Sequence, residues 1–263
     1  MIWLELALIG ASAGFLAGYL GIGGGIILVP ALAWLFNSSP ETSRFALHLA
    51  IATSLASMLV TSMSSVLAHH RRRAILWPLT LRLAPGLMLG SMLGAVIADQ
   101  VNGRVLSIII GIFALMVGGH LLAGKAADAA RALPGRAAHA ALGVLFGTIS
   151  ALVGIGGGSL TVPWFLRHGI LPQNAVATAA ACGYPIAIAG SAAFVALGWQ
   201  DIPVPDTVGY IHVPAMAGAS IFGALAAPIG AAAVHRTPAQ YVRRVFGVFL
   251  MAVAAVLLSG WRP

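Results

Sequence analysis

The feature of this sequence that suggests a chemical role is a glycine-rich stretch that occurs twice. Residues 14–30 and residues 147–163 share the run Gly-Ile-Gly-Gly-Gly, and Val-Pro follows it, at a constant offset of 133 residues. Each glycine costs roughly 1 kcal/mol relative to alanine inside a helix, so three in a row predict a break in an otherwise apolar segment. Backbone amides that no side chain covers, followed by a helix start, are able to bind an anion.

The residues around these glycines form a predicted anion site. Its members are Gly23, Gly24 and Gly25 in the first stretch, Gly156, Gly157, Gly158 and Ser159 in the second, and the hydroxyl residues Thr53, Ser54 and Thr178 in the apolar segments that follow. For the glycines, the alternative is close packing between membrane helices. For the hydroxyl residues, the alternative is a hydrogen bond to the backbone of their own helix, and for Ser159 it is a helix cap.

Two ionisable residues extend the predicted site. Arg82 is the one cation well inside an apolar segment, and we expect it to attract anions at the inner mouth of the site. The alternative is that its long side chain snorkels to the membrane edge. His48 lies in the same segment as Thr53, near the outer end, where it is expected to carry a proton or to bond the substrate. A packing role is the alternative for this histidine.

Composition places the chain in a lipid bilayer and argues against catalysis. Hydrophobic residues make up 60% of the sequence and charged residues only 8%, whereas about a quarter of residues are charged in soluble proteins. The net charge of +8 comes from short connections between apolar runs, so it reports membrane orientation and predicts no nucleic-acid partner. No zinc-protease, nucleotide-binding or serine-hydrolase motif is present. We therefore expect no enzyme activity, no cofactor and no metal.

Apolar segments organise the chain into two matching halves. The segments cover residues 2–20, 26–36, 45–68, 75–98, 104–123, 139–153, 159–168, 174–198, 209–233 and 241–260. Residues 1–123 form the first predicted repeat, residues 124–138 a cytoplasmic linker, and residues 139–263 the second repeat of one membrane domain. Short matches in the same order, such as Ala52-Thr53 with Ala177-Thr178, indicate an internal duplication like that of many secondary transporters.

Charges in the connections predict that the two halves are inverted. The connection after the third segment holds Arg71, Arg72 and Arg73 in the first half, whereas its counterpart holds Asp201 and Asp206. Under the positive-inside rule, equivalent loops then face opposite sides of the membrane. The predicted fold is an all-α membrane protein with two inverted repeats, each a glycine-broken helical hairpin plus three transmembrane helices. Ten of the 14 Lys and Arg residues fall on one side, which predicts that both termini are periplasmic.

The glycine motifs also carry a family resemblance. Two Gly-x-Gly-Gly-Gly-x-x-x-x-Pro stretches each open a half, and Ala52-Thr53-Ser54-Leu55 follows the first. This pattern resembles the sulfite exporter TauE/SafE family over essentially the whole chain. The resemblance implies a carrier of small sulfur-containing anions, such as sulfite, thiosulfate, sulfoacetate or another organosulfonate, in the bacterial inner membrane. The second half has Thr178-Ala179-Ala180, which departs from the commoner Thr-Ser pattern.

Taken together, these features predict a secondary transporter that moves such an anion by alternating access. Because the sequence contains no nucleotide-binding motif, we expect transport to be driven by a gradient. A carrier or channel for another small anion, such as a monocarboxylate, is the alternative. The expected partners are the small anionic substrate and the lipid bilayer, with proton or ion coupling left open. The particular anion, the direction of transport and the oligomeric state are not predicted.

Overall fold

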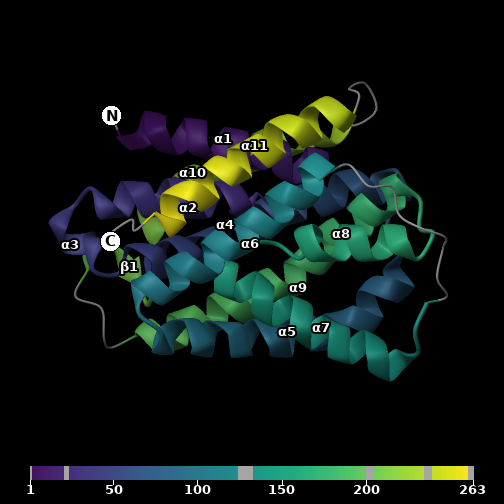
Figure 1. The fold of residues 1–263 in the computed structure, drawn as a ribbon, viewed down its shortest axis with the longest axis horizontal. Helices are drawn as coiled ribbons and strands as arrows, with labels where there is room; N and C mark the ends of the chain where they lie inside the picture. Colours follow the sequence, from purple (N-terminus) through teal and green to yellow (C-terminus); the bar gives the residue numbers. More distant parts are fainter. Residues whose placement is uncertain (1, 21–23, 124–132, 200–203, 234–238, 260–263) are drawn as a thin grey trace.

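The computed structural model describes residues 2–20, 24–123, 133–199, 204–233 and 239–259, and these are almost entirely helical (Figure 1). The first half contains α1 (Ile2–Leu20), α2 (Gly25–Asn37), α3 (Pro40–Ser43), α4 (Ala46–Arg71), α5 (Trp77–Gln100) and α6 (Gly103–Ala123). The second half contains α7 (Arg136–Val153), α8 (Gly158–Arg167), α9 (Pro172–Gly198), α10 (Val213–Ala233) and α11 (Ala239–Leu258). A short antiparallel pair, β1 (Thr207–Val208) and β2 (Ile211–His212), precedes α10. Apart from this pair, the prediction of a helical protein is confirmed.

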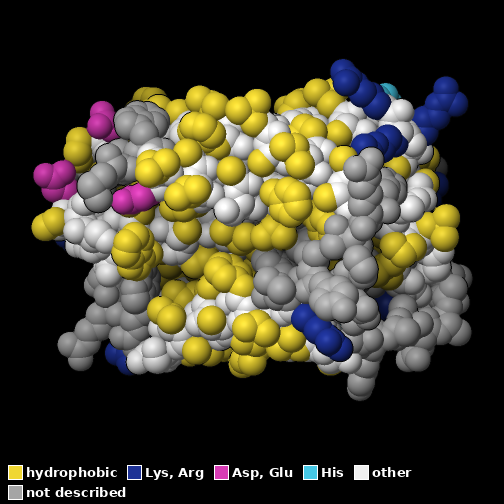
Figure 2. Space-filling model, turned by 90° about the horizontal axis from the view of Figure 1, so that it is seen from above, with side chains coloured by type: hydrophobic (Ala, Val, Ile, Leu, Met, Phe, Trp, Pro, Cys, Tyr) yellow, Lys and Arg dark blue, Asp and Glu magenta, His cyan; other side chains and the backbone are white. Residues whose placement is uncertain are grey.

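Several helices have the length and composition of membrane spans. Within the described part of the chain, α4, α5, α6, α9 and α10 are long and apolar enough to cross a membrane. Helices α1, α2, α7 and α11 contain shorter apolar stretches. Figure 2 shows hydrophobic side chains spread over the middle of the molecule, with most Lys and Arg at one end of the long axis and Asp and Glu at the other. This is the surface of a protein that crosses a membrane several times.

Local sequence explains where several helices begin and end. Helix α9 starts at Pro172, and α5 has Pro78 in its first turn, where the amide proton that proline lacks would have no partner in any case. Helix α7 ends at Gly154, whose φ of 69° is the left-handed conformation that glycine adopts without strain. A helix that stops at glycine and restarts a few residues later is the break that the glycine run predicts.

Helices α4 and α9 occupy the centre of the molecule. The most apolar stretch of α4 is 72% buried, compared with 39% for α6, so α4 is surrounded by protein and α6 is peripheral. Helix α4 packs against α9, and each of them packs against a helix of the opposite half, α4 on α10 and α9 on α5. Helix α1 likewise packs on α10, α7 packs on α5, and α6 pairs with α11. The contacts between halves are therefore reciprocal.

Small residues let the reciprocal helix pairs approach with their backbones in contact. A Cβ atom on Gly10 of α1 would lie 2.7 Å from the carbonyl oxygen of Ala219 in α10. In the reciprocal pair, a Cβ atom on Gly94 of α5 would lie 2.5 Å from the carbonyl oxygen of Thr148 in α7. Membrane helices associate through such close packing because lipid gives them little hydrophobic driving force. Packing is thus one genuine role of glycine in this chain.

Local boundaries differ from the sequence prediction in a few places. Helix α10 starts at Val213 and not at residue 209, because β1 and β2 form a turn before it. The unpredicted α3 is fastened to the end of α2, since the Thr42 hydroxyl donates to the carbonyl of Phe36. Helix α7 begins at Arg136, inside the predicted linker 124–138, and residues 124–132 of that linker lie outside the described residues.

Candidate functional site

Each half of the chain contains a turn of glycines that leads into a short helix. The first glycine turn is residues 24–26, where Gly24 has a φ of 70° and precedes α2. The second glycine turn is residues 154–159, which follow the end of α7 and include the first two residues of α8. Neither α2 nor α8 has a side-chain cap at its N-terminus. Gly23, which belongs to the predicted site, lies outside the described residues.

The two glycine turns meet in the interior of the protein. A Cβ atom on Gly25 would clash with the carbonyl oxygen of Gly154, and it would lie 2.9 Å from Cα of Ile155. The Ser54 hydroxyl of α4 donates to the same Gly154 carbonyl at 2.8 Å. All of these residues are buried. The glycines thus bring backbone from both halves together against α4, closer than side chains would permit.

The first amide groups of α2 and α8 belong to these turns. The amide of Leu28 bonds to the carbonyl of Gly24, and the amide of Thr161 bonds to the carbonyl of Gly157. The amides of Ile27 and Leu160 bond to the same two carbonyls. The amides before them have no carbonyl one turn earlier in their own helix, as at every helix start. Each helix start also carries about half a positive charge. The two turns therefore combine backbone donors with a positive potential, which suits an anion.

Ser159 is the residue at which the two turns differ most. Its hydroxyl is buried in the second glycine turn and has no hydrogen-bond partner in the described structure. The first glycine turn has Ile26 at the corresponding position, 133 residues earlier. The neighbouring Thr161 hydroxyl does have a partner, because it donates to the Gly157 carbonyl at 2.9 Å. A buried hydroxyl without a partner is costly, and an oxygen atom of a ligand would satisfy it.

Hydroxyl residues of α4 and α9 bond to the backbone of the opposite half. Thr53 Oγ1 accepts a hydrogen bond from the amide of His212 at 3.0 Å. Thr178 Oγ1 accepts one from the amide of Leu76, also at 3.0 Å. Ser54 donates to the second glycine turn. None of these bonds runs to the backbone of the same helix, which is the alternative that the sequence leaves open, and all of them hold the two halves together.

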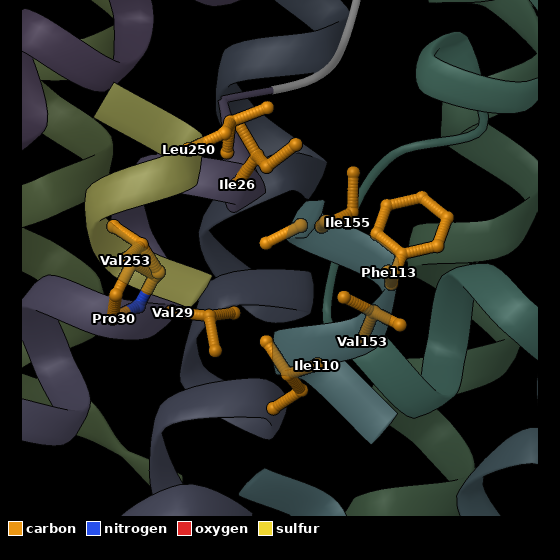
Figure 3. Close-up of a pocket in the computed structure, with 10 residues that line it drawn as sticks. Ile26, Val29, Pro30, Ile110, Phe113, Val153, Ile155, Leu250 and Val253 are labelled. Atoms are coloured by element: carbon orange, nitrogen blue, oxygen red, sulfur yellow. The ribbon is translucent and has the colours of Figure 1, made fainter. Parts of the chain in front are cut away.

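A small apolar cavity lies beside both glycine turns, since Ile26 of the first turn and Ile155 of the second line it (Figure 3). Its volume is about 10 Å³, and side chains of α2, α6 and α11 such as Ile26, Phe113 and Leu250 line it. A space of that size holds about one water molecule. An anion cannot enter it unless the surrounding helices move.

A larger cavity lies at the end of the molecule that carries α3 and the strand pair. Its volume is about 140 Å³, and its polar lining residues are Ser39, Thr42 and His212. Nδ1 of His212 accepts a hydrogen bond from the amide of Ala215 at 3.3 Å. Burial lowers the pKa of His212 below its ordinary value of 6.5, although the charge of Asp206 opposes this effect. The imidazole is therefore neutral at neutral pH.

Comparison with known proteins identifies the family. The family model described as sulfite exporter TauE/SafE matches residues 6–257, which is nearly the whole chain. The chain belongs to the TauE/SafE family. The resemblance that the paired glycine motifs carry is thereby confirmed, and the protein is a multi-pass membrane protein of this family.

Relatives of this TauE/SafE protein match it along its length. A probable membrane transporter protein of Haemophilus influenzae is 29% identical over 249 residues, which are 94% of each chain. The probable membrane transporter protein YunE of Bacillus subtilis is 26% identical over 98% of each chain. A probable membrane transporter protein of Xylella fastidiosa is 28% identical over 96% of this chain and 93% of its own. No solved structure matches the chain.

Two predicted site residues of this TauE/SafE chain are not brought to the glycine turns. Nε2 of His48 lies 3.1 Å from the carbonyl oxygens of both Ala98 and Val101, at the end of α5. Its ring stacks on Tyr210 with the centroids 5.6 Å apart. His48 therefore fastens α4 to the end of α5. Arg82 is exposed on the outer surface of α5, which is where a snorkelling side chain would lie.

Other residues that organise the site were not predicted. The Tyr210 hydroxyl donates to Asp99 at 2.8 Å and so connects the strand pair to the end of α5. The sequence does contain a signal for this contact. Asp99 and Tyr210 each lie at the end of an apolar segment, and a carboxylate can accept a hydrogen bond from a phenol. Leu76 and His212 give no such signal, since each contributes a backbone amide to its threonine and the side-chain type is irrelevant to that bond.

Proposed function

We propose that this protein is a secondary transporter that moves a small sulfur-containing anion across the bacterial inner membrane. The substrate class comprises sulfite, thiosulfate, sulfoacetate and other organosulfonates. The proposal depends above all on the contact of the two glycine turns at Gly25 and Gly154, next to two uncapped helix starts. Membership of the sulfite exporter TauE/SafE family supports the same substrate class.

The donors at the turns suit an oxyanion that must be both bound and released. A sulfonate or sulfite group presents three oxygens, which backbone amides and hydroxyl groups can bond. An arginine would hold such a group by strong paired hydrogen bonds and would slow its release. We assign the Ser159 hydroxyl and the amides of residues 156–159 as the main donors, with Gly24 and Gly25 completing the site from the first half.

We further propose that the halves are inverted repeats that operate by alternating access. The reciprocal packing of α1 on α10 and α7 on α5 supports this arrangement. So does the separation of basic from acidic side chains along the molecule (Figure 2). In transporters of this kind the substrate binds between the repeats, and movement of one part against the other exposes it to each side in turn. By the positive-inside rule the basic end is cytoplasmic and both termini are periplasmic.

The described conformation fits a closed intermediate of that cycle. The cavity beside the first glycine turn has room for about one water molecule, which is less than any sulfonate requires. Hydrogen bonds between the halves, such as those of Thr53 and Thr178, close the protein around the turns. Substrate entry therefore requires that helices of one half move away from the other.

Transport by purified protein in liposomes tests the proposal. Uptake of radiolabelled sulfoacetate, sulfite and thiosulfate is measured, with acetate as the monocarboxylate for comparison. We expect uptake of at least one sulfur-containing anion, and we expect unlabelled substrate inside the vesicles to accelerate it, because a carrier exchanges its substrate. Electrical current without such exchange would indicate a channel. Uptake of acetate with no uptake of any sulfur-containing anion would overturn the substrate class.

A further inference from the structure

Two threonines occupy equivalent places in the two halves and make equivalent bonds. Thr53 of α4 accepts from the amide of His212, the residue directly before α10, and Thr178 of α9 accepts from the amide of Leu76, the residue directly before α5. Both distances are 3.0 Å, and both threonine side chains are fully buried. Each threonine thus caps a helix that belongs to the other half.

The two bonds lie toward opposite ends of the molecule. Thr53 is near the start of α4, which follows α3 at the end that carries the strand pair (Figure 1). Thr178 is near the start of α9, and the far end of α9 reaches the strand pair, where a Cβ atom on Gly198 would lie 2.7 Å from the amide nitrogen of Tyr210. We call the Thr53–His212 bond the acidic-end latch and the Thr178–Leu76 bond the basic-end latch.

Each latch separates the interior from one end of the protein. His212 lines the 140 Å³ cavity at the acidic end, so the acidic-end latch lies between that cavity and the centre of α4. At the basic end, Asn174 adds a second bond beside the latch, from its side-chain amide to the Ala74 carbonyl at 2.8 Å. Cys182 lies one helical turn after Thr178 on α9. A Cβ atom on Gly157 would lie 4.0 Å from the Cβ atom of Cys182. The basic-end latch therefore lies one turn of α9 away from a residue that packs beside the second glycine turn.

We infer that the two latches are the gates of the transport cycle, and that each opens while the other stays closed. This inference rests on the proposed function, because gates have a purpose only in a transporter. A hydroxyl-to-amide bond suits the task, since it is directional but weak enough to break and re-form. Both latches are closed in the described conformation, in agreement with the small cavity at the turns.

A matched pair of cysteine reporters allows each gate to be observed without substrate. Cys182 is the only cysteine of the chain and lies four residues after Thr178. Ser57 lies four residues after Thr53, and both side chains are fully buried. The native protein reports on the basic end through Cys182, and the double variant Ser57→Cys/Cys182→Ser reports on the acidic end. The rate of alkylation by a small maleimide is measured by mass spectrometry in lipid nanodiscs, which leave both faces accessible.

The latch variants should affect the two reporters in opposite ways. Thr178→Val removes the hydroxyl at nearly constant shape, and we expect it to raise the alkylation rate of Cys182 about fivefold or more while the rate at position 57 stays the same or falls. Thr53→Val should raise the rate at position 57 and not that of Cys182. Thr178→Ser and Thr53→Ser, which keep the hydroxyl, should leave both rates near those of the parent.

Two results would overturn the inference. One is that neither valine variant changes the rate at its own reporter. The other is that either variant raises both rates together, which indicates general loosening of the fold, and the melting temperature of each variant is recorded to recognise it. Because no substrate is present, these results are independent of the transport assay. If the latch variants respond as expected but the protein transports no sulfur-containing anion, the proposed substrate class is wrong and the gate inference stands.

Discussion

The two glycine turns have nearly the same sequence but different surroundings. In the first turn, Gly25 lies directly against the Gly154 carbonyl, and the next residue, Ile26, lines a small apolar cavity. In the second turn, the corresponding residue is Ser159, whose buried hydroxyl has no partner in the described structure. Both turns share the Gly25–Gly154 contact, and Ile155 of the second turn lines the same cavity, but of the two only the second turn has a buried side-chain hydroxyl without a partner in the described structure. We conclude that a repeated motif does not imply two equal halves of a site.

This difference suggests a division of roles. The first turn brings backbone of one half against backbone of the other, which is a packing role. The second turn presents a polar group that only a ligand or water would satisfy, which is a binding role. The following predictions test this division, beginning with the largest expected effect.

Substitution of Gly25 by alanine should be the most damaging change. The new Cβ atom meets the backbone carbonyl of Gly154, which cannot move aside without moving the whole second turn. We expect a loss of about 3 kcal/mol of stability. In the second turn, Gly157→Ala should cost about 1 kcal/mol or less, because the nearest atom is the flexible end of Ile186, at 2.9 Å. Thermal unfolding in detergent measures both, and Gly119→Ala, which meets no atom within 4 Å, is the control. Equal losses for both turns would contradict the division.

Removal of the Ser54 hydroxyl should have an intermediate effect. Ser54→Ala leaves the buried Gly154 carbonyl without its 2.8 Å side-chain donor, and we expect a loss of about 1–2 kcal/mol. Ser57→Ala is the matched control, because the Ser57 hydroxyl donates to the Thr53 carbonyl of its own helix and not to the other half of the described structure. The control should change stability by less than about 0.5 kcal/mol. The melting temperatures of the two variants provide the comparison, and a smaller loss for Ser54→Ala than for Ser57→Ala would show that the contact between turns is unimportant.

Substitution of Ser159 by alanine should affect binding and spare the fold. Its hydroxyl has no partner to lose, so we expect unchanged or slightly higher stability. Affinity for the transported anion should fall about fivefold, the value of one hydrogen bond of about 1 kcal/mol. Concentration-dependent uptake in liposomes measures this effect. Ser220→Ala removes a buried hydroxyl of α10 that also has no partner among the described residues, and it should leave affinity unchanged. Equal affinities of Ser159→Ala and the parent would remove Ser159 from the site.

The smallest expected effect concerns His212 at the acidic end. Burial lowers its pKa in the folded protein below the ordinary value of 6.5, so the unfolded chain takes up the proton first as the pH falls. The free energy of unfolding should therefore decrease from about pH 6.5 down to the lowered pKa and then level off. His212→Gln removes this dependence. Melting curves of the parent and the variant between neutral and mildly acidic pH test it, and an identical slope for both proteins would assign the pH dependence to other groups.

Much of the fold could be predicted because membrane helices follow simple rules. Apolar runs of sufficient length and glycine breaks placed every long helix of the described chain within a few residues. The strand pair before α10 and the short α3 were missed, since segments of two to four residues have too little pattern to detect. Their positions depend on tertiary bonds such as that of Tyr210 to Asp99.

The candidate site could be predicted only in part. The glycines at its centre could be predicted because three consecutive glycines destabilise a helix, which indicates a break at that point. The roles of Thr53 and Thr178 did not follow from the sequence, because their partners are the backbone amides of distant residues, and any residue type supplies an amide. The role of Arg82 at the inner mouth of the site stays a prediction, because the structure shows only that its side chain is exposed on α5.

The sequence by itself determined that this chain lies in a membrane, breaks its helices at two glycine runs and belongs to the TauE/SafE family. These properties depend on composition and on local backbone energetics, which each stretch of sequence sets without contacts to distant residues. Only the tertiary structure decided that Gly25 meets Gly154, that Ser159 stays unpaired and that the threonines bond across the halves. Such contacts depend on how whole helices are rotated and shifted against each other, and that is set by packing of the entire protein.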